Sequence, residues 1–147
     1  MIGLAKEVDP RTKLDDGTYK LTADTGSLRY MAPEVALGKP YNETADTFSF
    51  SILSWQIFAL ETPYTGYTMA MFQNKVIKAG TRPKINVEWG ETVCSILRES
   101  FVGNPKRPSM SEVTELLRDE INKLSDDEIV DVMDASRKSY MSAHAGR

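Results

Sequence analysis

The sequence contains only one cysteine, Cys94, and only one histidine, His144. A single cysteine excludes a disulfide within the chain, so an intracellular, cytoplasmic location is the default expectation. Cys94 lies between Val93 and Ile96 and is expected to be a core residue rather than a reactive thiol. His144 stands alone in a tail of small residues and is expected to be solvated. Neither residue predicts a metal site or a catalytic site.

The chain also lacks an excess of positive charge. Its 18 Lys and Arg against 21 Asp and Glu give a net charge of −3, so neither nucleic acid nor an anionic membrane is expected as a partner. The longest apolar stretch, residues 48–60, is too short to span a bilayer and is interrupted by Ser49, Ser51, Ser54 and Gln56. The first residues lack the basic-then-apolar pattern of a signal peptide.

No stretch alternates apolar and polar residues as several strands would require, so a mainly α architecture is predicted. The apolar residues of the central stretch occupy every face of a helix that Asn42 or Thr44 can cap. This helix is expected to be buried on all sides and to end before Pro63. Apolar residues at spacings of three and four predict further helices over 69–79 and 93–101.

Two capping boxes predict the starts of the last helices. In such a box a serine and a glutamate three residues later bond each other's free backbone amides. Ser109 and Glu112 form the first box, ahead of apolar residues that run from Val113 to Leu124. Ser125 and Glu128 form the second.

Three motifs follow one another along the chain. Residues 26–34 read Gly-Ser-Leu-Arg-Tyr-Met-Ala-Pro-Glu, Asp46 opens the apolar run of residues 45–57, and residues 104–108 read Asn-Pro-Lys-Arg-Pro. The first motif resembles the end of a protein kinase activation segment, where Ala-Pro-Glu closes the substrate-docking loop. The second resembles the long central helix of a kinase C-terminal lobe. The third resembles the Arg-Pro element before the last helix of that lobe.

The resemblance to protein kinases begins at the first residues and extends to about residue 124. Gly3 opens a Gly-Leu-Ala-Lys run that resembles the sequence after the metal-binding Asp-Phe of the Asp-Phe-Gly motif, but Met1 and Ile2 stand in those two places. In an intact kinase the Gly-rich loop, the strand lysine, the helix glutamate and the His-Arg-Asp loop would all precede Met1. The chain is therefore expected to be the C-terminal half of a kinase domain.

This resemblance implies the helical C-terminal lobe of the protein-kinase-like fold, preceded by an irregular activation segment. Residues 1–34 would be the activation-segment-like region, 35–124 the lobe helices, and 125–147 a C-terminal helix with a frayed tail. Residues 6–24 are rich in Asp, Lys, Thr and Gly without lasting periodicity, which independently predicts a mobile loop.

Glu34 and Arg107 match a kinase pair that joins the activation segment to the helical body. A guanidinium can hold a carboxylate through two parallel hydrogen bonds, which fixes its orientation as well as its distance. The alternative is that they are two unrelated surface charges. Their matching motifs favour the pair, and the role implied is structural, without proton transfer.

Asp46 matches the aspartate that accepts hydrogen bonds from the kinase catalytic loop. An acid in the first turn also suits the helix dipole, and within this chain only that capping role can operate. Leu53 and Ile57 match positions beneath the apolar column that supports the adenine ring, although ordinary core packing would also explain them. Trp55 and the Ser-Phe run before it resemble the tyrosine-kinase-like group.

Ser27 occupies the place of the substrate-loop hydroxyl that contacts the catalytic aspartate, in a local pattern typical of serine/threonine kinases. Thr22 and Thr25 lie where activating phosphates are found, and a phosphate could order the loop through arginine. A plain polar loop is the alternative for these two threonines. The resemblance assigns six residues to the activation segment and substrate loop: Gly3, Ser27, Tyr30, Ala32, Pro33 and Glu34.

Phosphoryl transfer depends on positioning and on charge neutralisation by metal, lysine and a catalytic aspartate, and these ligands are missing. The first hypothesis is a truncated Ser/Thr kinase whose complete parent uses ATP and Mg²⁺, while the isolated chain binds no cofactor and is inactive. The alternative is a non-catalytic interaction module that offers the 69–79 helix to partners. A protein substrate or a partner kinase lobe is the expected partner. In a whole kinase the catalytic loop and the helix before it cover part of the central helix, so one flank of this helix is expected to be uncovered here.

Overall fold

The computed structural model describes residues 8–21, 28–104 and 106–124. The chain divides into two compact units, Met1–Val113 and Thr114–Arg147. Gly3, Thr22, Thr25, Ser27 and the Ser125–Glu128 capping box lie outside the described residues.

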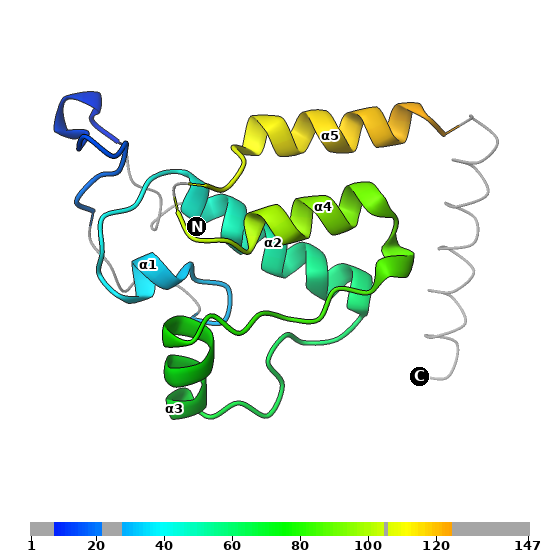
Figure 1. Cartoon of the computed structure of the whole chain (residues 1–147), viewed down its shortest axis with the longest axis horizontal. Coiled ribbons are helices and arrows are strands. Elements are labelled where there is room, and N and C mark those ends of the chain that lie inside the picture. The colour runs from blue at the N-terminus through cyan, green and yellow to red at the C-terminus, as the bar shows by residue number, and fades with distance from the viewer. Residues whose placement is uncertain (1–7, 22–27, 105, 125–147) are drawn as a thin grey trace, which may run out of the picture. The chain divides into compact units, whose positions relative to one another are not determined.

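The described elements are helical and confirm the mainly α architecture. Within the described ranges, β pairing is limited to one isolated antiparallel bridge between Tyr19 and Tyr41. In chain order the helices are η1 (Pro10–Thr12, 3-10), α1 (Pro33–Ala36), α2 (Thr44–Ala59), α3 (Met69–Met71), η2 (Phe72–Lys78, π), η3 (Val87–Trp89, 3-10), α4 (Glu91–Ser100) and α5 (Met110–Asn122) (Figure 1).

α2 carries the main core of the first unit. Its N-cap is Glu43, whose side chain makes no capping hydrogen bond, so the prediction that Asn42 or Thr44 caps the helix is wrong. Asn42 instead supports the first turn, because its Oδ1 accepts hydrogen bonds from the Thr44 backbone N–H at 3.1 Å and from the Thr44 hydroxyl at 2.7 Å. The helix ends at Leu60, which is left-handed with φ 53°, and so it stops before Pro63 as predicted. No helix in the described part of the chain is both long and apolar enough to cross a membrane.

The expectation that α2 is buried on all sides is wrong. Ile52 is fully buried, whereas Leu53 is 47% and Ile57 62% exposed. Successive helical residues are about 100° apart, so a helix packed from one side buries Ile52 and leaves its neighbour Leu53 outside. The uncovered flank predicted for this helix is present.

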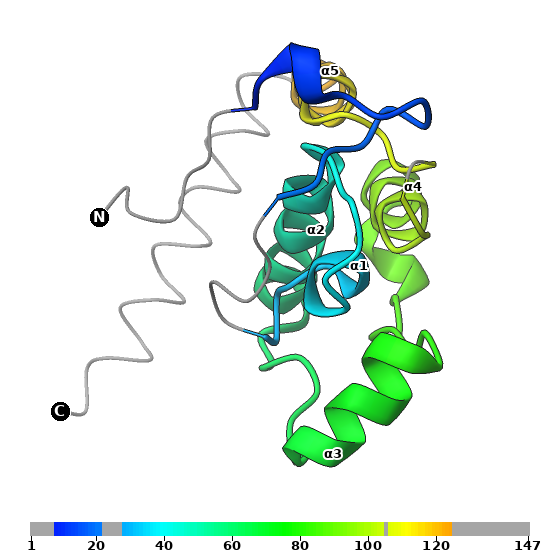
Figure 2. The same ribbon diagram turned by 90° about the vertical axis from the view of Figure 1, so that its left-hand side faces the viewer.

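α4 covers the buried side of α2, and the two helices lie side by side in both views (Figures 1 and 2). Leu97 is fully buried between them, and the rings of Phe48 and Phe101 lie 6.3 Å apart. Cys94 is 1% exposed, which confirms that it is a core residue. Its thiol lies 3.4 Å from the Asn86 carbonyl oxygen, to which it can donate weakly.

The predicted 69–79 helix begins as α3, where the Thr68 hydroxyl caps the Met71 N–H at 3.2 Å, and widens into the π-helical η2. The buried residues of η2 are Phe72, Val76 and Ile77. Their spacings of four and five suit the wider π turn, which brings residues i, i+4 and i+5 to one side. In the sequence, spacings of three and four put Met69, Phe72, Val76 and Ala79 on one helical face, but Met69 and Ala79 are exposed.

α5 begins at the predicted capping box. The Ser109 N–H donates to Glu112 Oε2 at 2.7 Å, and the Glu112 N–H donates to Ser109 Oγ at 3.2 Å. The hydrogen bonds from Ser109 lower the pKa of the Glu112 carboxyl. This reciprocal pairing confirms the box and explains why the helix starts at Met110.

Residues 8–21 are more structured than the predicted mobile loop. Asp9 caps the short η1, and the backbones of Tyr19 and Tyr41 exchange hydrogen bonds of 2.8 and 3.1 Å. Thr18 and Tyr19 are buried. The local sequence pattern around Tyr19 gave no sign of this bridge, because its partner Tyr41 lies beyond α1 in the chain.

Candidate functional site

Arg107 and Glu34 lie against each other although 73 positions separate them in the sequence. Arg107 Nη2 donates to Glu34 Oε2 at 2.9 Å, and Nη1 donates to Oε1. The side chain of Arg107 is fully buried and that of Glu34 is 11% exposed. The two groups thus form a bidentate ion pair that is almost closed to solvent, the geometry in which a guanidinium fixes a carboxylate most firmly.

The Ala-Pro-Glu triplet builds the short helix that presents Glu34. Pro33 occupies the first helical position, where its fixed φ suits the helix and its missing N–H costs no hydrogen bond. Ala32 precedes it in an extended conformation and is 1% exposed, so its methyl group is part of the α2 core. Glu34 follows in the first turn of α1, directed to Arg107.

Arg107 also binds the backbone of two other segments. Its Nε donates to the Val102 carbonyl at 2.8 Å, and its Nη1 lies 3.3 Å from the Thr44 carbonyl at the start of α2. Its guanidinium carbon is 4.9 Å from the centre of the Phe48 ring, within cation–π range. One side chain therefore joins α1, α2 and the segment after α4.

A second arginine, Arg82, reaches the same aromatic ring. Its guanidinium carbon is 5.0 Å from the Phe48 centroid, its Nε donates to the Phe101 carbonyl at 3.1 Å, and its Nη1 donates to the Val76 carbonyl at 3.1 Å. Burial, and then the nearby Arg107 cation, lower the pKa of Arg82. Sequence reasoning missed Arg82, because it lies outside the three motifs.

The residues before the triplet are also held in place. The Tyr30 hydroxyl donates to Gln56 Oε1 on α2 at 2.6 Å, and Arg29 donates through Nη1 to the Pro63 carbonyl. Residues 28–36 are thus fixed to α2 and to the segment after it by two side chains that precede the Ala-Pro-Glu triplet.

Three predicted residues on α2 lie in different surroundings. Trp55 is buried, donates from Nε1 to the Lys84 carbonyl at 2.9 Å, and meets the edge of Trp89 at 6.3 Å between ring centroids. Asp46 is exposed in the first helical turn. For the exposed Leu53 and Ile57, the alternative explanation of ordinary core packing is wrong.

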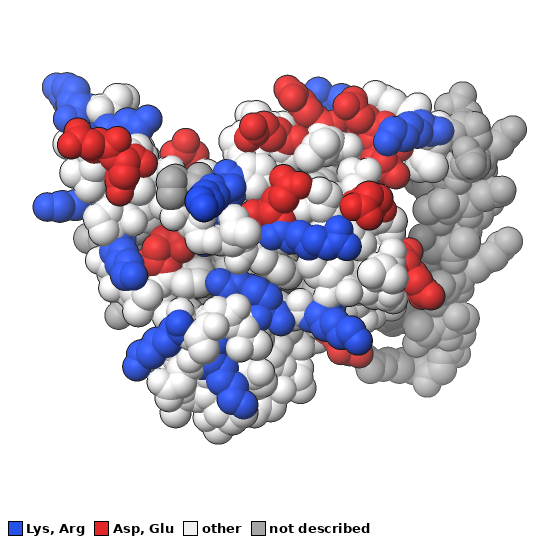
Figure 3. Space-filling model, in the orientation of Figure 1, with Lys and Arg blue, Asp and Glu red and all other residues white. Residues whose placement is uncertain are grey.

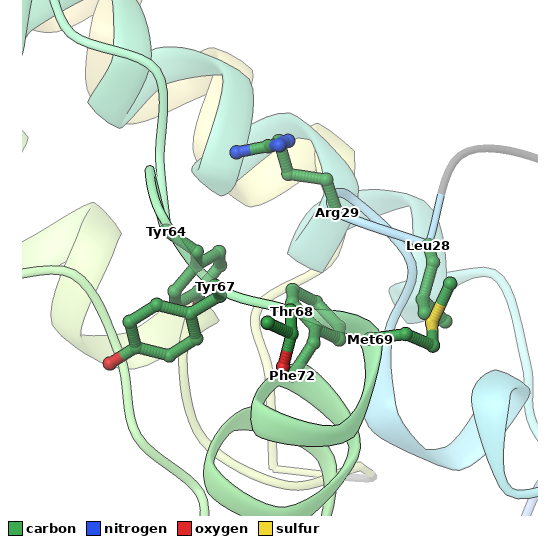
Figure 4. Close-up of a pocket in the computed structure, with 7 residues that line it drawn as sticks. All are labelled: Leu28, Arg29, Tyr64, Tyr67, Thr68, Met69 and Phe72. Carbon is green, nitrogen blue, oxygen red and sulfur yellow. The ribbon is translucent and has the colours of Figure 1, made fainter.

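A pocket of about 200 Å³ lies beside this framework and was not anticipated from the sequence. The close-up places Leu28 and Met69 on one side of it and Tyr64 and Tyr67 on the other (Figure 4). Its lining comes from segments far apart in the sequence, so no local pattern could reveal it. Among the described residues, no group of His, Cys, Asp or Glu is arranged to hold a metal ion.

Comparison with known proteins agrees with these motifs. A sequence profile of the protein tyrosine and serine/threonine kinase family matches residues 2–117. The chain is 38% identical over 109 residues to serine/threonine-protein kinase STY17 of Arabidopsis thaliana, a match that covers 74% of this chain and 19% of that protein. It is 37% identical over 93 residues to dual specificity protein kinase shkD of Dictyostelium discoideum, covering 62% and 12%.

A third relative matches over more of the chain. Dual specificity protein kinase shkB of Dictyostelium discoideum is 28% identical over 147 residues, covering 97% of this chain and 21% of that protein. The chain thus spans about a fifth or less of the length of these curated relatives. The profile match over most of its residues, together with its helices, shows that the chain belongs to the protein tyrosine and serine/threonine kinase family and has the helical C-lobe of the kinase fold.

Proposed function

We propose that the chain is the substrate platform of a Ser/Thr-specific protein kinase of the tyrosine-kinase-like group, whose complete domain transfers the ATP γ-phosphate to protein hydroxyls. The buried Glu34–Arg107 pair is the observation that carries the proposal. It fixes the Ala-Pro-Glu segment to α2, which is what a loop needs in order to present a protein substrate at a constant place. The Ser/Thr kinase relatives support the specificity.

In this proposal each activation-segment residue has a positioning role. Ser27 contacts the catalytic aspartate of the complete domain, and Tyr30 holds the segment on α2 through Gln56. A phosphate on Thr22 or Thr25 orders the loop through an arginine, since phosphate adds negative charge and strong acceptors. Asp46 accepts hydrogen bonds from the catalytic loop.

The 147 residues alone are proposed to be inactive. The proposed location of the protein is the cytoplasm. Phosphoryl transfer requires a lysine on the phosphates, a metal held by aspartate and a catalytic base. ATP and Mg²⁺ belong to the complete domain, and the expected partners are a protein substrate and the remaining kinase lobe.

Calorimetric titration with Mg-ATP tests the inactivity. No heat of tight binding is expected, and radiolabelled ATP should give no transfer to a generic protein substrate. Low-micromolar affinity, or transfer in a preparation free of other kinases, would contradict this part of the proposal.

Reading the transcript upstream of the Met1 codon tests the kinase assignment. His-Arg-Asp, then Asn, then Asp-Phe in the same frame would support an enzyme. A stop codon in that frame would favour the second candidate, a non-catalytic interaction module. That candidate is favoured by one observation, the exposed Leu53 and Ile57 on α2, which offer an apolar surface to a partner.

A further inference from the structure

Arg82 places a second cation beside the Glu34–Arg107 pair. Its Nη1 donates to the Val76 carbonyl in the last turn of η2, and its Nε donates to the Phe101 carbonyl at the C-cap of α4, each at 3.1 Å. The C-terminal ends of helices carry free carbonyl groups and a partial negative charge, and a cation satisfies both. Arg82 therefore joins the end of η2 to the end of α4.

The side chains of Arg82 and Arg107 bind the same two parts of the core. Their Nε atoms donate to consecutive carbonyls, those of Phe101 and Val102, at 3.1 and 2.8 Å. Their guanidinium carbons lie 5.0 and 4.9 Å from the centre of the Phe48 ring. This ring is 1% exposed, and the attraction between a cation and an aromatic face is strongest where water is excluded. Displacing one arginine therefore changes the surroundings of the other.

The charge of Arg82 is balanced from outside its own segment. Residues 62–87 contain three lysines besides Arg82 and no acidic residue, and Figure 3 shows blue Lys and Arg atoms over α3 and η2. Within the described ranges, no carboxylate lies at ion-pair distance from Arg82. Burial lowers the pKa of Arg82, the Arg107 cation adds to this decrease, and the Glu34 carboxylate opposes it. Glu34 thus balances Arg107 by direct contact and Arg82 over a longer distance.

We propose that Arg82 is a positioning residue for the segment that presents Glu34, and that it acts through the groups it shares with Arg107. Its cation carries this role, because its partners are carbonyl oxygens and an aromatic face. Ala36 of α1 packs against the buried residues of η2, so the helix that presents Glu34 already contacts the helix that Arg82 caps. The inference rests on the proposed function only in treating this segment as a substrate platform. The coupling itself requires neither ATP nor a substrate, so a failure of the proposed kinase activity would leave it unaffected.

The side-chain signal of Arg107 tests the proposal in the full chain. Its Nε–H donates to the Val102 carbonyl from a fully buried side chain, so this proton should exchange slowly with water in proton–nitrogen NMR spectra. Arg82→Met removes the neighbouring cation and keeps an unbranched side chain. The Arg107 proton should then exchange about tenfold faster or more, the factor that corresponds to losing one hydrogen bond to a charged group. Lys84→Met, which removes an exposed cation two positions away, is the matched control and should leave the exchange unchanged.

Arg82→Lys separates the charge of the side chain from its bulk. Lysine and methionine are both unbranched, but only lysine can place a cation over the Phe48 ring and donate to a carbonyl. Arg82→Lys should therefore recover most of the protection of the Arg107 proton that Arg82→Met loses. Equally fast exchange in both variants, or loss of folding in both by circular dichroism, would refute a role for the cation. A folded Arg82→Lys beside an unfolded Arg82→Met would support that role.

A double-mutant cycle with Glu34→Gln tests the charge balance. Arg82→Met should lower the urea midpoint of the parent. In the Glu34→Gln background the loss should be smaller, because the attraction between Arg82 and the carboxylate is already absent. Lys84→Met should have the same effect in both backgrounds. An equal loss for Arg82→Met in both backgrounds would overturn the proposal. If Glu34→Gln does not fold, the exchange measurements on the two Arg82 variants decide the question.

Discussion

Arg107 makes the contacts on which the position of α1 depends. It binds Glu34 through two parallel hydrogen bonds, binds the Val102 carbonyl, and lies over the Phe48 ring. Buried charges are costly unless they are paired, and here the partner lies 73 positions away in the sequence. The ion pair therefore fixes a position in the fold, whether or not it adds net stability.

Removing the guanidinium should be severely destabilising. Arg107→Ala leaves Glu34 buried without its partner, and loss of one member of a buried pair typically costs about 3–5 kcal/mol. Arg107→Lys should recover only part of this, because an ammonium cannot reproduce the two parallel bonds. Denaturant unfolding followed by circular dichroism measures both. Lys106→Ala, at the exposed neighbouring residue, is the control. An Arg107→Ala shift no larger than that of the control would refute the structural role of the pair.

Tyr64 should make stability fall in alkaline solution. Burial raises its pKa to about 12, against about 10 when unfolded, and the nearby Arg82 cation limits the rise. As pH rises from about 10 to about 12 the unfolded chain loses this proton first, so ionisation favours unfolding in that window. The geometry is consistent, since the hydroxyl oxygen is buried without a well-formed hydrogen bond in the described part of the chain.

Tyr64→Phe tests this directly. The variant should lose less stability than the parent when urea unfolding at pH 9 is compared with unfolding near pH 11. At neutral pH its stability should equal or exceed that of the parent, since removing a buried hydroxyl that makes no well-formed hydrogen bond costs little. An identical pH dependence for parent and variant would show that the phenol titrates normally.

At the scale of the element, α2 is a helix with one packed side and one uncovered side. Burial of a large apolar side chain is worth roughly 1.5–3 kcal/mol, and that stabilisation is absent where the side chain faces water. Ile52 and Ile57 illustrate the two sides, with 0% and 62% exposure. The same residue type on the same helix therefore provides a matched comparison.

Ile52→Ala should cost about 2–5 kcal/mol, because it removes buried methyl groups and leaves a cavity beside Leu97 and Phe48. Ile57→Ala should change stability by no more than about 0.5 kcal/mol, as surface substitutions usually do. Thermal unfolding of the two variants measures the difference. Equal losses would mean that Ile57 is covered in solution.

At the scale of the whole molecule, the uncovered side of α2 should control association. Leu53 and Ile57 lie one turn apart, and Phe58 and Leu60 add exposures of 44% and 90% nearby in the sequence. Exposed apolar surface of this kind marks a partner site or an aggregation hazard. In a complete kinase the catalytic loop and the preceding helix are expected to cover it.

The isolated chain is therefore expected to self-associate and to bind a dye that reports exposed apolar surface. Size-exclusion chromatography with light scattering measures the first property, and dye fluorescence the second. The double substitution Leu53→Lys with Ile57→Lys should reduce both, whereas Lys20→Ala at an exposed residue should not. A monodisperse parent monomer with a cooperative melt and no dye signal would show that this flank finds cover within the 147 residues.

Local signals in the sequence determined the helices and their ends. The Ser109–Glu112 box could be read without a structure because its two partners are three residues apart and bond each other's backbone amides. Pro63 similarly ensured that α2 stops before it. The three ordered motifs led to the kinase family, since each motif is a short contiguous string.

Tertiary structure alone decided which faces are covered and which distant groups meet. Helical periodicity cannot tell Ile52 from Leu53 in a run whose apolar residues occupy every face of the helix, because coverage depends on where α4 lies. The π turn of η2 buries Ile77 in place of Ala79, a choice set by packing. Arg82 and the pocket beside α3 also escaped prediction. Their partners come from segments far apart in the sequence, and only the folded chain brings those segments together.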